Sequence, residues 1–321
     1  MTSQVTSSNA SAPSSTRVAF AFAAIYLGWG STYLAIRVAV HSFPPLLMMG
    51  ARHMIAGALL YAILRGRGAA LLSPREWRGA LITGAFFMLG GHGSLAWAEQ
   101  HVTSGLAALL AATIPLWMVL LSPRREGEPW LTAQTGTGLA LGAAGVALLI
   151  GPDALHCASR ADLLGAGAVL FAAISWAIGS SARSRLHLPS SSAMVAAAQM
   201  LVGGALLLIT GSAFGETRDV HLASIPPRAV FAFGYLIVVG SLLGFTAYIW
   251  LLSVRSHARV ATYAYVNPVV AVFLGWALGG EHVSPRILVA AAIIVAGVFL
   301  AIRNPVQREQ EKPAERSMGL D

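Results

Sequence analysis

Residues 18–37 read VAFAFAAIYLGWGSTYLAIR, and this stretch decides the fold class. No charged side chain lies between Arg17 and Arg37, which flank the apolar part of the run. A helix rises about 1.5 Å per residue, so about twenty apolar residues cross a hydrocarbon core of about 30 Å. The run is too long for the core of a typical signal peptide. It therefore predicts a retained transmembrane helix.

The composition of the whole chain agrees with this prediction. Of 321 residues, 56% are hydrophobic and 11% are charged, against roughly 25% charged in soluble proteins. The mean hydropathy is +0.69. The net charge of +8 comes from short basic clusters between apolar runs, which disfavours a nucleic-acid interface. Cys157 is the only cysteine, so a disulfide within the chain is excluded and a thiolate metal site is not expected.

Apolar segments of near-spanning length recur along the chain. They fall at 18–37, 44–64, 78–98, 103–121, 131–150, 163–182, 192–211, 229–252, 258–279 and 286–302. The sequence thus predicts an all-α polytopic membrane protein with ten transmembrane helices. Residues 1–16 are expected to form a disordered leader, and 303–321 a polar cytoplasmic tail.

The basic residues alternate between the two sides of this arrangement. With a cytoplasmic N-terminus, fifteen lie on the inner side and five on the outer side, with Arg52 alone inside a span. Inner loops of membrane proteins are enriched in Lys and Arg. Both termini are therefore predicted to be cytoplasmic.

An internal repeat appears when the second half is laid on the first. At an offset of 147 residues Trp29 falls on Trp176, and at an offset of 153 Pro115 falls on Pro268. Each half holds five predicted spans, and an odd number inverts the second half relative to the first. Inverted repeats place binding sites between the halves and give alternating access by rocking.

Arg52 is the most unusual residue, because it lies eight residues into the second span. An ionised group at that depth costs several kcal/mol unless it faces a polar cavity, so its default interpretation is functional. The alternative is that it snorkels outward or pairs structurally, for instance with Glu99.

The first span carries Trp29 and Tyr33 one turn apart on one face. Small and hydroxyl residues interrupt its apolar character beside them, at Gly28, Gly30 and Ser31. Such residues allow a local break that exposes backbone to a substrate, or close helix packing.

In the ninth span Tyr263 and Asn267 are one turn apart, next to Pro268. Pro268 and its repeat mate Pro115 predict helix kinks at matching places, which is the expected pointer to a midplane cavity. In the alternative interpretation, Asn267 only satisfies the backbone carbonyl that the proline frees.

His92, in the third span, is the candidate for proton coupling, because no Asp or Glu lies deep in any span. A neutral packing histidine is the alternative. Glu99 and Glu281 are interpreted as rim residues at the outer ends of odd-numbered spans. No phosphate-binding loop, metal-spaced cluster or catalytic triad appears, so no cofactor or metal is expected and an enzyme is disfavoured.

Several motifs together resemble the EamA family of the drug/metabolite transporter superfamily, in its YedA-like branch. They are the run from Trp29 through Gly30-Ser31-Thr32-Tyr33 to Arg37, the pair Pro44-Pro45 with Arg52, and the run from Tyr263 through Asn267-Pro268 to Glu281. The resemblance spans about residues 18–302 and implies two EamA repeats, 17–151 and 162–302. One departure is His53, where members commonly carry Phe.

The resemblance implies a bacterial inner-membrane carrier, usually an exporter of small metabolites or drugs. The expected partners are a small-molecule substrate and the lipid bilayer, and a homodimer is compatible with this view. The predicted substrate-binding set is Trp29, Tyr33, Arg52, Trp176, Tyr263 and Asn267, with Arg52 attracting an anionic group. Two other classes stay open at this point, a membrane-embedded lipid-modifying enzyme and a non-transporting scaffold or sensor.

Overall fold

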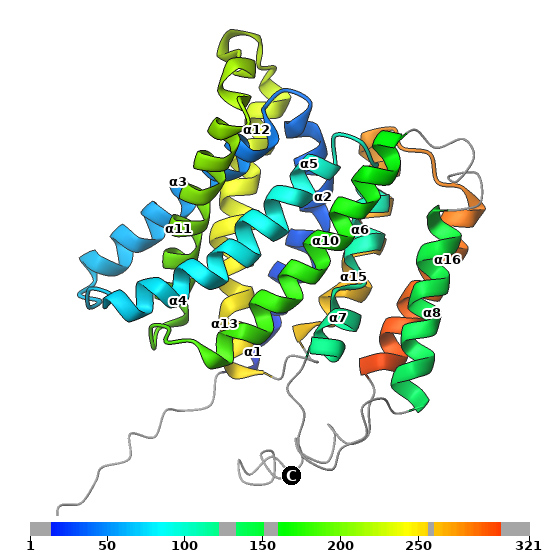
Figure 1. Cartoon of the computed structure of the whole chain (residues 1–321), viewed down its shortest axis with the longest axis horizontal. Coiled ribbons are helices and arrows are strands. Elements are labelled where there is room, and N and C mark those ends of the chain that lie inside the picture. The colour runs from blue at the N-terminus through cyan, green and yellow to red at the C-terminus, as the bar shows by residue number, and fades with distance from the viewer. Residues whose placement is uncertain (1–13, 122–132, 151–159, 256–259, 303–321) are drawn as a thin grey trace, which may run out of the picture.

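A computed structural model describes residues 14–121, 133–150, 160–255 and 260–302, and these residues form helices and turns without a strand (Figure 1). The N-terminal half contains α1 Ser15–Ala23, η1 Ala24–Gly28, α2 Trp29–Val40, α3 Pro45–Gly66, α4 Pro74–Gly84, η2 Ala85–Gly93, α5 Ser94–Ala98, α6 Ser104–Ala111, α7 Ile114–Leu121 and α8 Ala133–Ile150. The C-terminal half contains α10 Arg160–Ala182, η3 Arg183–Arg185, α11 Ser192–Ala213, η4 Glu216–Asp219, η5 Leu222–Ser224, α12 Pro227–Tyr235, η6 Leu236–Phe245, α13 Thr246–Val254, α15 Tyr263–Gly279 and α16 Pro285–Ile302.

The described helices are those of a polytopic membrane protein. Six continuous segments are long and apolar enough to cross a bilayer, namely Ser15–Val40, Pro45–Gly66, Pro74–Ala98, Asp162–Arg185, Ser192–Ala213 and Pro227–Val254. Three shorter apolar helices accompany them. The count of ten spans, their inversion and the sides of the termini stay predictions. Most of the leader and the whole tail lie outside the described residues, although α1 begins at Ser15, inside the range expected to be disordered.

Local sequence explains where the helices begin and end. Pro45, Pro74 and Pro227 each occupy a first helical position, where a missing N–H costs nothing. Ser73 and Glu76 form a capping box at the start of α4. At the end of α15, Gly280 adopts a left-handed conformation with φ of 67°, which glycine tolerates without steric cost.

Helices that correspond in the two halves pack against each other. In Figure 1, α3 lies along α11, and α8 lies along α16 at the right edge of the molecule. Glycines make the first contact close: a Cβ at Gly57 would lie 2.9 Å from the backbone nitrogen of Leu201, and one at Gly204 would lie 2.9 Å from that of Met54. Helix association in lipid depends on such small residues, because no hydrophobic effect drives it there.

The third and eighth predicted spans both contain long π-helical segments. These are η2 and η6, and the repeat offset of 153 places residues 85–93 on residues 238–246, which almost coincide with η6. A π-helix widens the turn and is common at functional sites. The matching position of the two segments supports the repeat.

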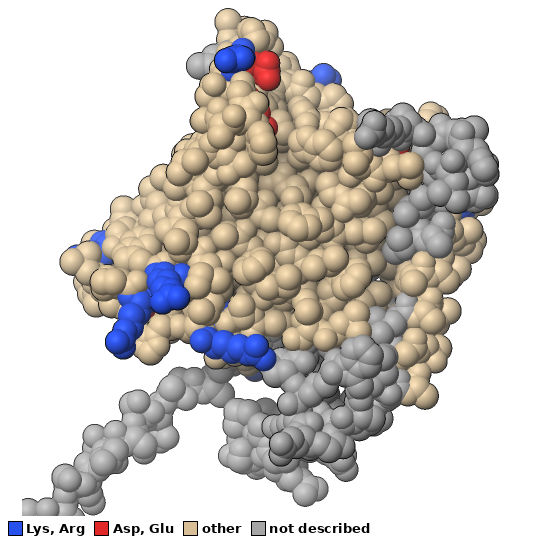
Figure 2. Space-filling view, in the orientation of Figure 1, with Lys and Arg blue, Asp and Glu red and all other residues tan. Residues whose placement is uncertain are grey.

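On the face drawn in Figure 2, the charged side chains of the described residues lie at the two ends of the molecule. We call the end where α2, α5 and α15 finish the upper end, as drawn in Figure 1, and the opposite end the lower end. Figure 2 shows a broad uncharged face with Lys and Arg gathered along its lower edge. That distribution is the one expected of a protein whose middle lies in lipid.

Candidate functional site

A narrow cavity lies at the centre of the bundle, and we call it the central cavity. Its volume is about 50 Å³. It is lined by Trp29, Thr32, Tyr33, Ile36, Gly91, His92, Leu95, Ala111, Ile114, Val169, Ala172, Ala173, Trp176, Tyr263 and Asn267. None of these lining side chains is acidic, Lys or Arg, so the wall is aromatic and aliphatic with a few neutral polar groups. Five of the six residues expected to bind substrate lie here together, along with His92.

Aromatic rings from both halves meet at this cavity. Trp29 contacts Trp176 edge to face with ring centroids 5.5 Å apart, and it contacts Tyr263 edge to face at 5.4 Å. Tyr248, on α13, lies behind them, 5.1 Å from Trp29 and 5.5 Å from Trp176. Edge-to-face pairs of this kind are each worth about 0.5–1.5 kcal/mol beyond the area they bury.

Hydrogen bonds fix the two tryptophans. The Trp29 indole N–H donates to the carbonyl of Gly240 over 3.0 Å, within η6. The Trp176 indole N–H donates to the Tyr248 hydroxyl over 3.0 Å, and that hydroxyl lies 2.8 Å from the Ser180 hydroxyl. Trp29 is therefore held in one orientation by the C-terminal half, whereas Trp176 is held by residues of its own half.

Asn267 connects α15 to the first span. In the amide orientation that satisfies its neighbours, its nitrogen donates to the carbonyls of Tyr26 at 2.9 Å and Ile25 at 3.0 Å. Both carbonyls belong to η1, where the π-helical turn leaves backbone acceptors available. Asn267 thus lines the cavity while its amide nitrogen contacts backbone carbonyls of the first span and, at 3.3 Å, the carbonyl of Tyr263 on its own helix.

Arg52 is buried outside the central cavity. Only 1% of it is exposed, and its Nε donates to the Ser241 hydroxyl over 2.8 Å. The guanidinium lies against Gly240, where an added Cβ would be 2.3 Å from Nη2. The structure therefore does not bring the predicted anion-binding residue to the cavity wall, and Arg52 has no ion pair with Glu99. Its charge links α3 to η6 instead.

Two histidines, His53 and His92, lie next to the buried pair of Arg52 and Ser241. The Ser241 hydroxyl lies 3.3 Å from Nδ1 of His53, so Arg52 and His53 share Ser241 although they are neighbours in sequence. His53 stacks on His92 with centroids 4.9 Å apart and an interplanar angle of 16°. His92 in turn meets the edge of Trp176 at 5.0 Å. The stack joins the Arg52 group to the cavity.

The two predicted kink positions differ in the structure. The fourth span is interrupted, with α6 ending at Ala111 and α7 beginning at Ile114, directly before Pro115. Pro268 lies inside the continuous helix α15. Both prolines are buried.

Comparison with known proteins identifies the family. Residues 15–151 and 160–303 each match the EamA-like transporter family. The chain belongs to the EamA-like transporter family. It is 39% identical over 283 residues to the inner membrane transporter YedA of Escherichia coli (strain K12), covering 86% of this chain and 88% of that one.

More distant relatives cover similar lengths. The transporter YoaV of Bacillus subtilis (strain 168) is 28% identical, over 88% of this chain and 96% of its own. A protein of Streptantibioticus cattleyicolor named "probable terminal-alkyne amino-acid exporter" is 29% identical, over 88% and 92%. One solved crystal structure has a TM-score of 0.64 at 24% identity, over 89% of this chain and 97% of that chain, which shows a shared fold.

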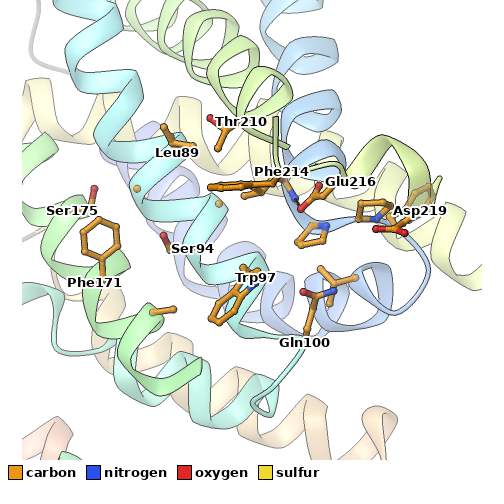
Figure 3. Close-up of a pocket in the computed structure, with 18 of the residues that line it drawn as sticks. Leu89, Ser94, Trp97, Gln100, Phe171, Ser175, Thr210, Phe214, Glu216 and Asp219 are labelled. Atoms are coloured by element: carbon orange, nitrogen blue, oxygen red, sulfur yellow. Dashed lines mark hydrogen bonds between the residues drawn. The ribbon is translucent and has the colours of Figure 1, made fainter. Parts of the chain in front are cut away.

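This EamA-like chain also has a larger hollow, which we call the lateral crevice (Figure 3). Its volume is about 1080 Å³. Leu89, Ser94 and Trp97 of the third predicted span lie opposite Phe171 and Ser175 of α10 across it. Phe214, Glu216 and Asp219 lie at its other side, toward the upper end.

A single helix contact separates the crevice from the central cavity. Ser175 of α10 lines the crevice and donates to the carbonyl of Phe86 over 2.8 Å, while its neighbour Trp176 lines the cavity. On η2, a Cβ at Gly90 would lie 2.1 Å from the Ser175 hydroxyl, and one at Gly91 would lie 2.9 Å from the Trp176 ring. Two glycines thus let η2 and α10 meet closely enough to close the wall between the two hollows.

Sequence reasoning missed several residues of this site. Ser241 and Tyr248 provide the partners of Arg52 and Trp176, but an isolated Ser or Tyr in an apolar run gives no signal of its own. His53 stood out only as a departure from the family pattern, and its contact with the same Ser241 as Arg52 was not predicted. The repeat offset of 147 places Arg52 on Gln199, which donates to the Thr83 hydroxyl over 2.7 Å. The signal available in the sequence was that the repeat aligns Arg52 with Gln199, two polar residues within apolar spans.

Proposed function

We propose that this protein is a secondary transporter that exports a small molecule across the bacterial inner membrane by alternating access. Membership of the EamA-like transporter family supports transport, and the inner membrane is the location named for the relative YedA. Export is the activity named for the relative from Streptantibioticus cattleyicolor. The substrate binds in the central cavity between the two halves.

One observation carries the proposal: Trp29 and Trp176, equivalent residues of the two halves, face each other in the central cavity. A site built from both halves changes shape when one half rocks against the other, which is what alternating access requires. The cavity of about 50 Å³ is smaller than a ligand pocket of about 300–1000 Å³. This conformation is therefore a closed state of the cycle, and the cavity widens when substrate binds.

The lining chemistry assigns roles to the predicted residues. Trp29, Trp176, Tyr33 and Tyr263 supply ring faces and edges that pack on apolar parts of the substrate. Asn267 holds the first span to α15. Arg52 acts as a positioning residue for η6, because its Nε donates to Ser241 of η6 and the guanidinium lies against Gly240.

The histidines carry no charge in this proposal. A protonated imidazole at His53 or His92 would place a second positive charge beside the buried guanidinium of Arg52. Neither His53 Nε2 nor His92 Nδ1 has a hydrogen-bond partner among the described residues. We therefore assign the stacked pair to neutral packing, and the proton-coupling role moves elsewhere.

The upper end faces the periplasm in this proposal. Arg65, Arg75, Arg78 and Arg183 lie at helix ends of the lower end, and this asymmetry follows the positive-inside rule. Both termini are then cytoplasmic, and the two repeats occupy residues 17–151 and 162–302. The lateral crevice opens toward the periplasmic half of the bilayer.

Metabolite profiling identifies the substrate and tests the proposal. Cells that overexpress the protein are expected to deplete one cytoplasmic metabolite and enrich the medium in it. Trp176→Ala, at equal protein level, is expected to lower this export about tenfold, since loss of about 1.4 kcal/mol of ring contacts corresponds to that factor. Trp276→Ala is the matched control, because Trp276 is 60% exposed and lies away from the cavity. Equal export by the Trp176→Ala variant would contradict the assigned site.

A further inference from the structure

A buried carboxyl group without a hydrogen-bond partner lies at the upper end. Glu99 directly follows α5, and none of it is exposed to solvent. Neither of its carboxyl oxygens has a hydrogen-bond partner in the described residues. A buried ionised carboxylate in that condition costs several kcal/mol, so such a group keeps a proton instead. The expectation that Glu99 is a rim residue is therefore not what the structure shows.

The neighbouring arginine does not neutralise Glu99. Arg37 donates from Nη1 to two backbone carbonyls, those of Glu99 and Val102. Its Nε faces a different carboxylate, Glu281, at 3.4 Å. One cation and two carboxyl groups thus share this region, and the cation is paired with Glu281.

Glu281, unlike Glu99, has hydrogen-bond partners for both of its carboxyl oxygens. Its Oε1 accepts from the Ser104 backbone N–H at 2.9 Å and from the Ser104 hydroxyl at 2.7 Å, and its Oε2 accepts from the Gly105 N–H at 3.2 Å. These N–H groups begin α6, where the helix dipole also favours a negative charge. Glu281 follows α15 of the second half, whereas α6 belongs to the first. The Glu281 contacts therefore tie the halves together at the upper end.

Several ionisable groups lie on the elements that pack against α5, the helix that ends directly before Glu99. These groups are Tyr33 and Arg37 on α2, Arg52 and His53 on α3, His92 on η2, Asp162 on α10, and Glu281 after α15. Arg37, Glu281 and Tyr33 interact electrostatically with Glu99. Burial raises the pKa of the Glu99 carboxyl well above its usual range, the Arg37 guanidinium opposes this, and the Glu281 carboxylate adds to it.

We propose that Glu99 is a proton-binding site that holds the upper end closed. When the Glu281 contacts break and the halves separate there, water reaches Glu99, and its carboxyl releases the proton to the medium. Closure takes up one proton again, so the closed state and the protonated state are linked. The inference rests on the proposed transport cycle, because closure at this end is one of its states.

The direction of the pH dependence follows from this linkage. The preference for closure is complete below the pKa of an exposed glutamate, about 4.3. It is lost as the pH rises toward the raised pKa of buried Glu99. Between these two values, the ratio of closed to open molecules falls close to tenfold per pH unit for one proton.

Distances between spin labels measure closure without substrate or transport. Labels at Gln100→Cys and His282→Cys report on the two sides of the Glu281 contacts, in a Cys157→Ala background of the full chain in lipid nanodiscs. Both label positions are exposed. We expect the short-distance fraction to fall with rising pH in the parent protein and to stay at its low-pH value in Glu99→Gln. The proposal would be overturned if the distribution of label distances in the parent protein did not change with pH, or if Glu99→Gln showed the same pH response as the parent.

Matched variants exclude other titrating groups at this end. Asp219→Asn removes an exposed carboxyl and is expected to keep the parent pH response. His101→Gln removes the histidine nearest in sequence, which contacts Trp97 at 4.8 Å, and is also expected to keep it. Loss of the response in His101→Gln, with Glu99 intact, would assign the proton to His101 and overturn the proposal.

Infrared difference spectroscopy tests the protonation state directly. A protonated carboxyl has a carboxylic C=O stretching band that an ionised carboxylate lacks. Parent protein at neutral pH is expected to show this band relative to Glu99→Gln, and its absence would refute a stored proton. Neither measurement involves transport, so failure here leaves the export proposal standing, and absence of export leaves the proton site standing.

Discussion

Trp29 and Trp176 meet edge to face at the centre of the bundle, with ring centroids 5.5 Å apart. They are the residues that the repeat offset of 147 makes equivalent, so each half contributes the same ring to one contact. Trp29 also holds η6 through its hydrogen bond to Gly240, whereas Trp176 is held by Tyr248. The two halves thus contribute the same type of ring to the contact, but the two rings have different hydrogen-bond partners.

This asymmetry predicts different effects of removing each indole N–H. Trp29→Phe keeps a ring but removes the hydrogen bond that joins the first span to the Gly240 carbonyl, and loss of one such bond costs about 0.5–1.5 kcal/mol. Trp176→Phe leaves the Tyr248 hydroxyl with Ser180 as a remaining partner. We expect thermal unfolding in nanodiscs to occur at lower temperature for Trp29→Phe than for Trp176→Phe. Equal unfolding temperatures would contradict this account of the supports.

Arg52 and Ser241 provide a second asymmetric pair. Ser241→Ala removes the hydroxyl that accepts from Nε of the buried guanidinium, and loss of a hydrogen bond to a charged group is expected to cost about 1.5–3 kcal/mol. Arg52→Met removes the charge together with its need for a partner, and such replacements are often close to neutral. Unfolding measurements on both variants and on the double variant are expected to show that Arg52→Met rescues Ser241→Ala.

Transport separates this role from anion binding. If Arg52 only positions η6, Arg52→Met is expected to keep export of the identified substrate within about twofold. Selective loss of anionic substrates, at normal protein level, would return Arg52 to the anion-binding role that its depth in the span first indicated.

The pairing of α3 with α11 predicts a steric effect at Gly57. An added Cβ would lie 2.9 Å from the Leu201 nitrogen and 3.1 Å from the Ala197 carbonyl oxygen, both rigid backbone. Gly57→Ala is therefore expected to destabilise the protein by about 1–3 kcal/mol through overpacking. Gly234→Ala is the control, since nothing lies within 4 Å of its Cβ position. Alanine is favoured there by about 0.5–1 kcal/mol in a helix.

Glu216 predicts a comparable effect at the upper end. Its carboxylate accepts from the N–H groups of Leu46 at 3.2 Å and Leu47 at 2.9 Å, at the start of α3. Glu216→Gln loses the charge and one acceptor, so unfolding is expected to be easier by about 1 kcal/mol. Asp219 lies three residues after Glu216 and is exposed, so Asp219→Asn is expected to change stability by less than about 0.5 kcal/mol.

Hydropathy predicted the helices well because lipid forces every spanning segment to satisfy its own backbone. The expected ranges 44–64 and 192–211 lie within two residues of α3 and α11. Five of the predicted binding residues line the cavity, namely Trp29, Tyr33, Trp176, Tyr263 and Asn267. They could be selected from the sequence because each interrupts the apolar pattern on one face of its helix. Such features depend only on neighbouring residues in the chain, so they can be recognised in a single sequence.

Contacts between helices could not be predicted in the same way. The depth of Arg52 is visible in the sequence, but whether its guanidinium faces the cavity or Ser241 depends on the rotation of α3 against η6. A π-helical segment changes which face of a helix its residues occupy, and no residue type marks a π-helix. Glu99 was interpreted as a rim residue because it ends a predicted span, and its position along the span does not show that the side chain is buried.

The stacked histidines allow a last prediction. His53 and His92 lie 4.9 Å apart beside Arg52, and a proton on either ring would face that fixed positive charge. His92→Gln and His53→Gln are therefore expected to keep the pH profile of export, measured in vesicles under an imposed pH gradient, although its maximal rate falls as packing against Trp176 changes. If His92→Gln removes the dependence on the gradient while substrate exchange persists, His92 carries the coupling proton. In that case the charge of Arg52 must move away during the cycle, because two buried positive charges close together repel each other.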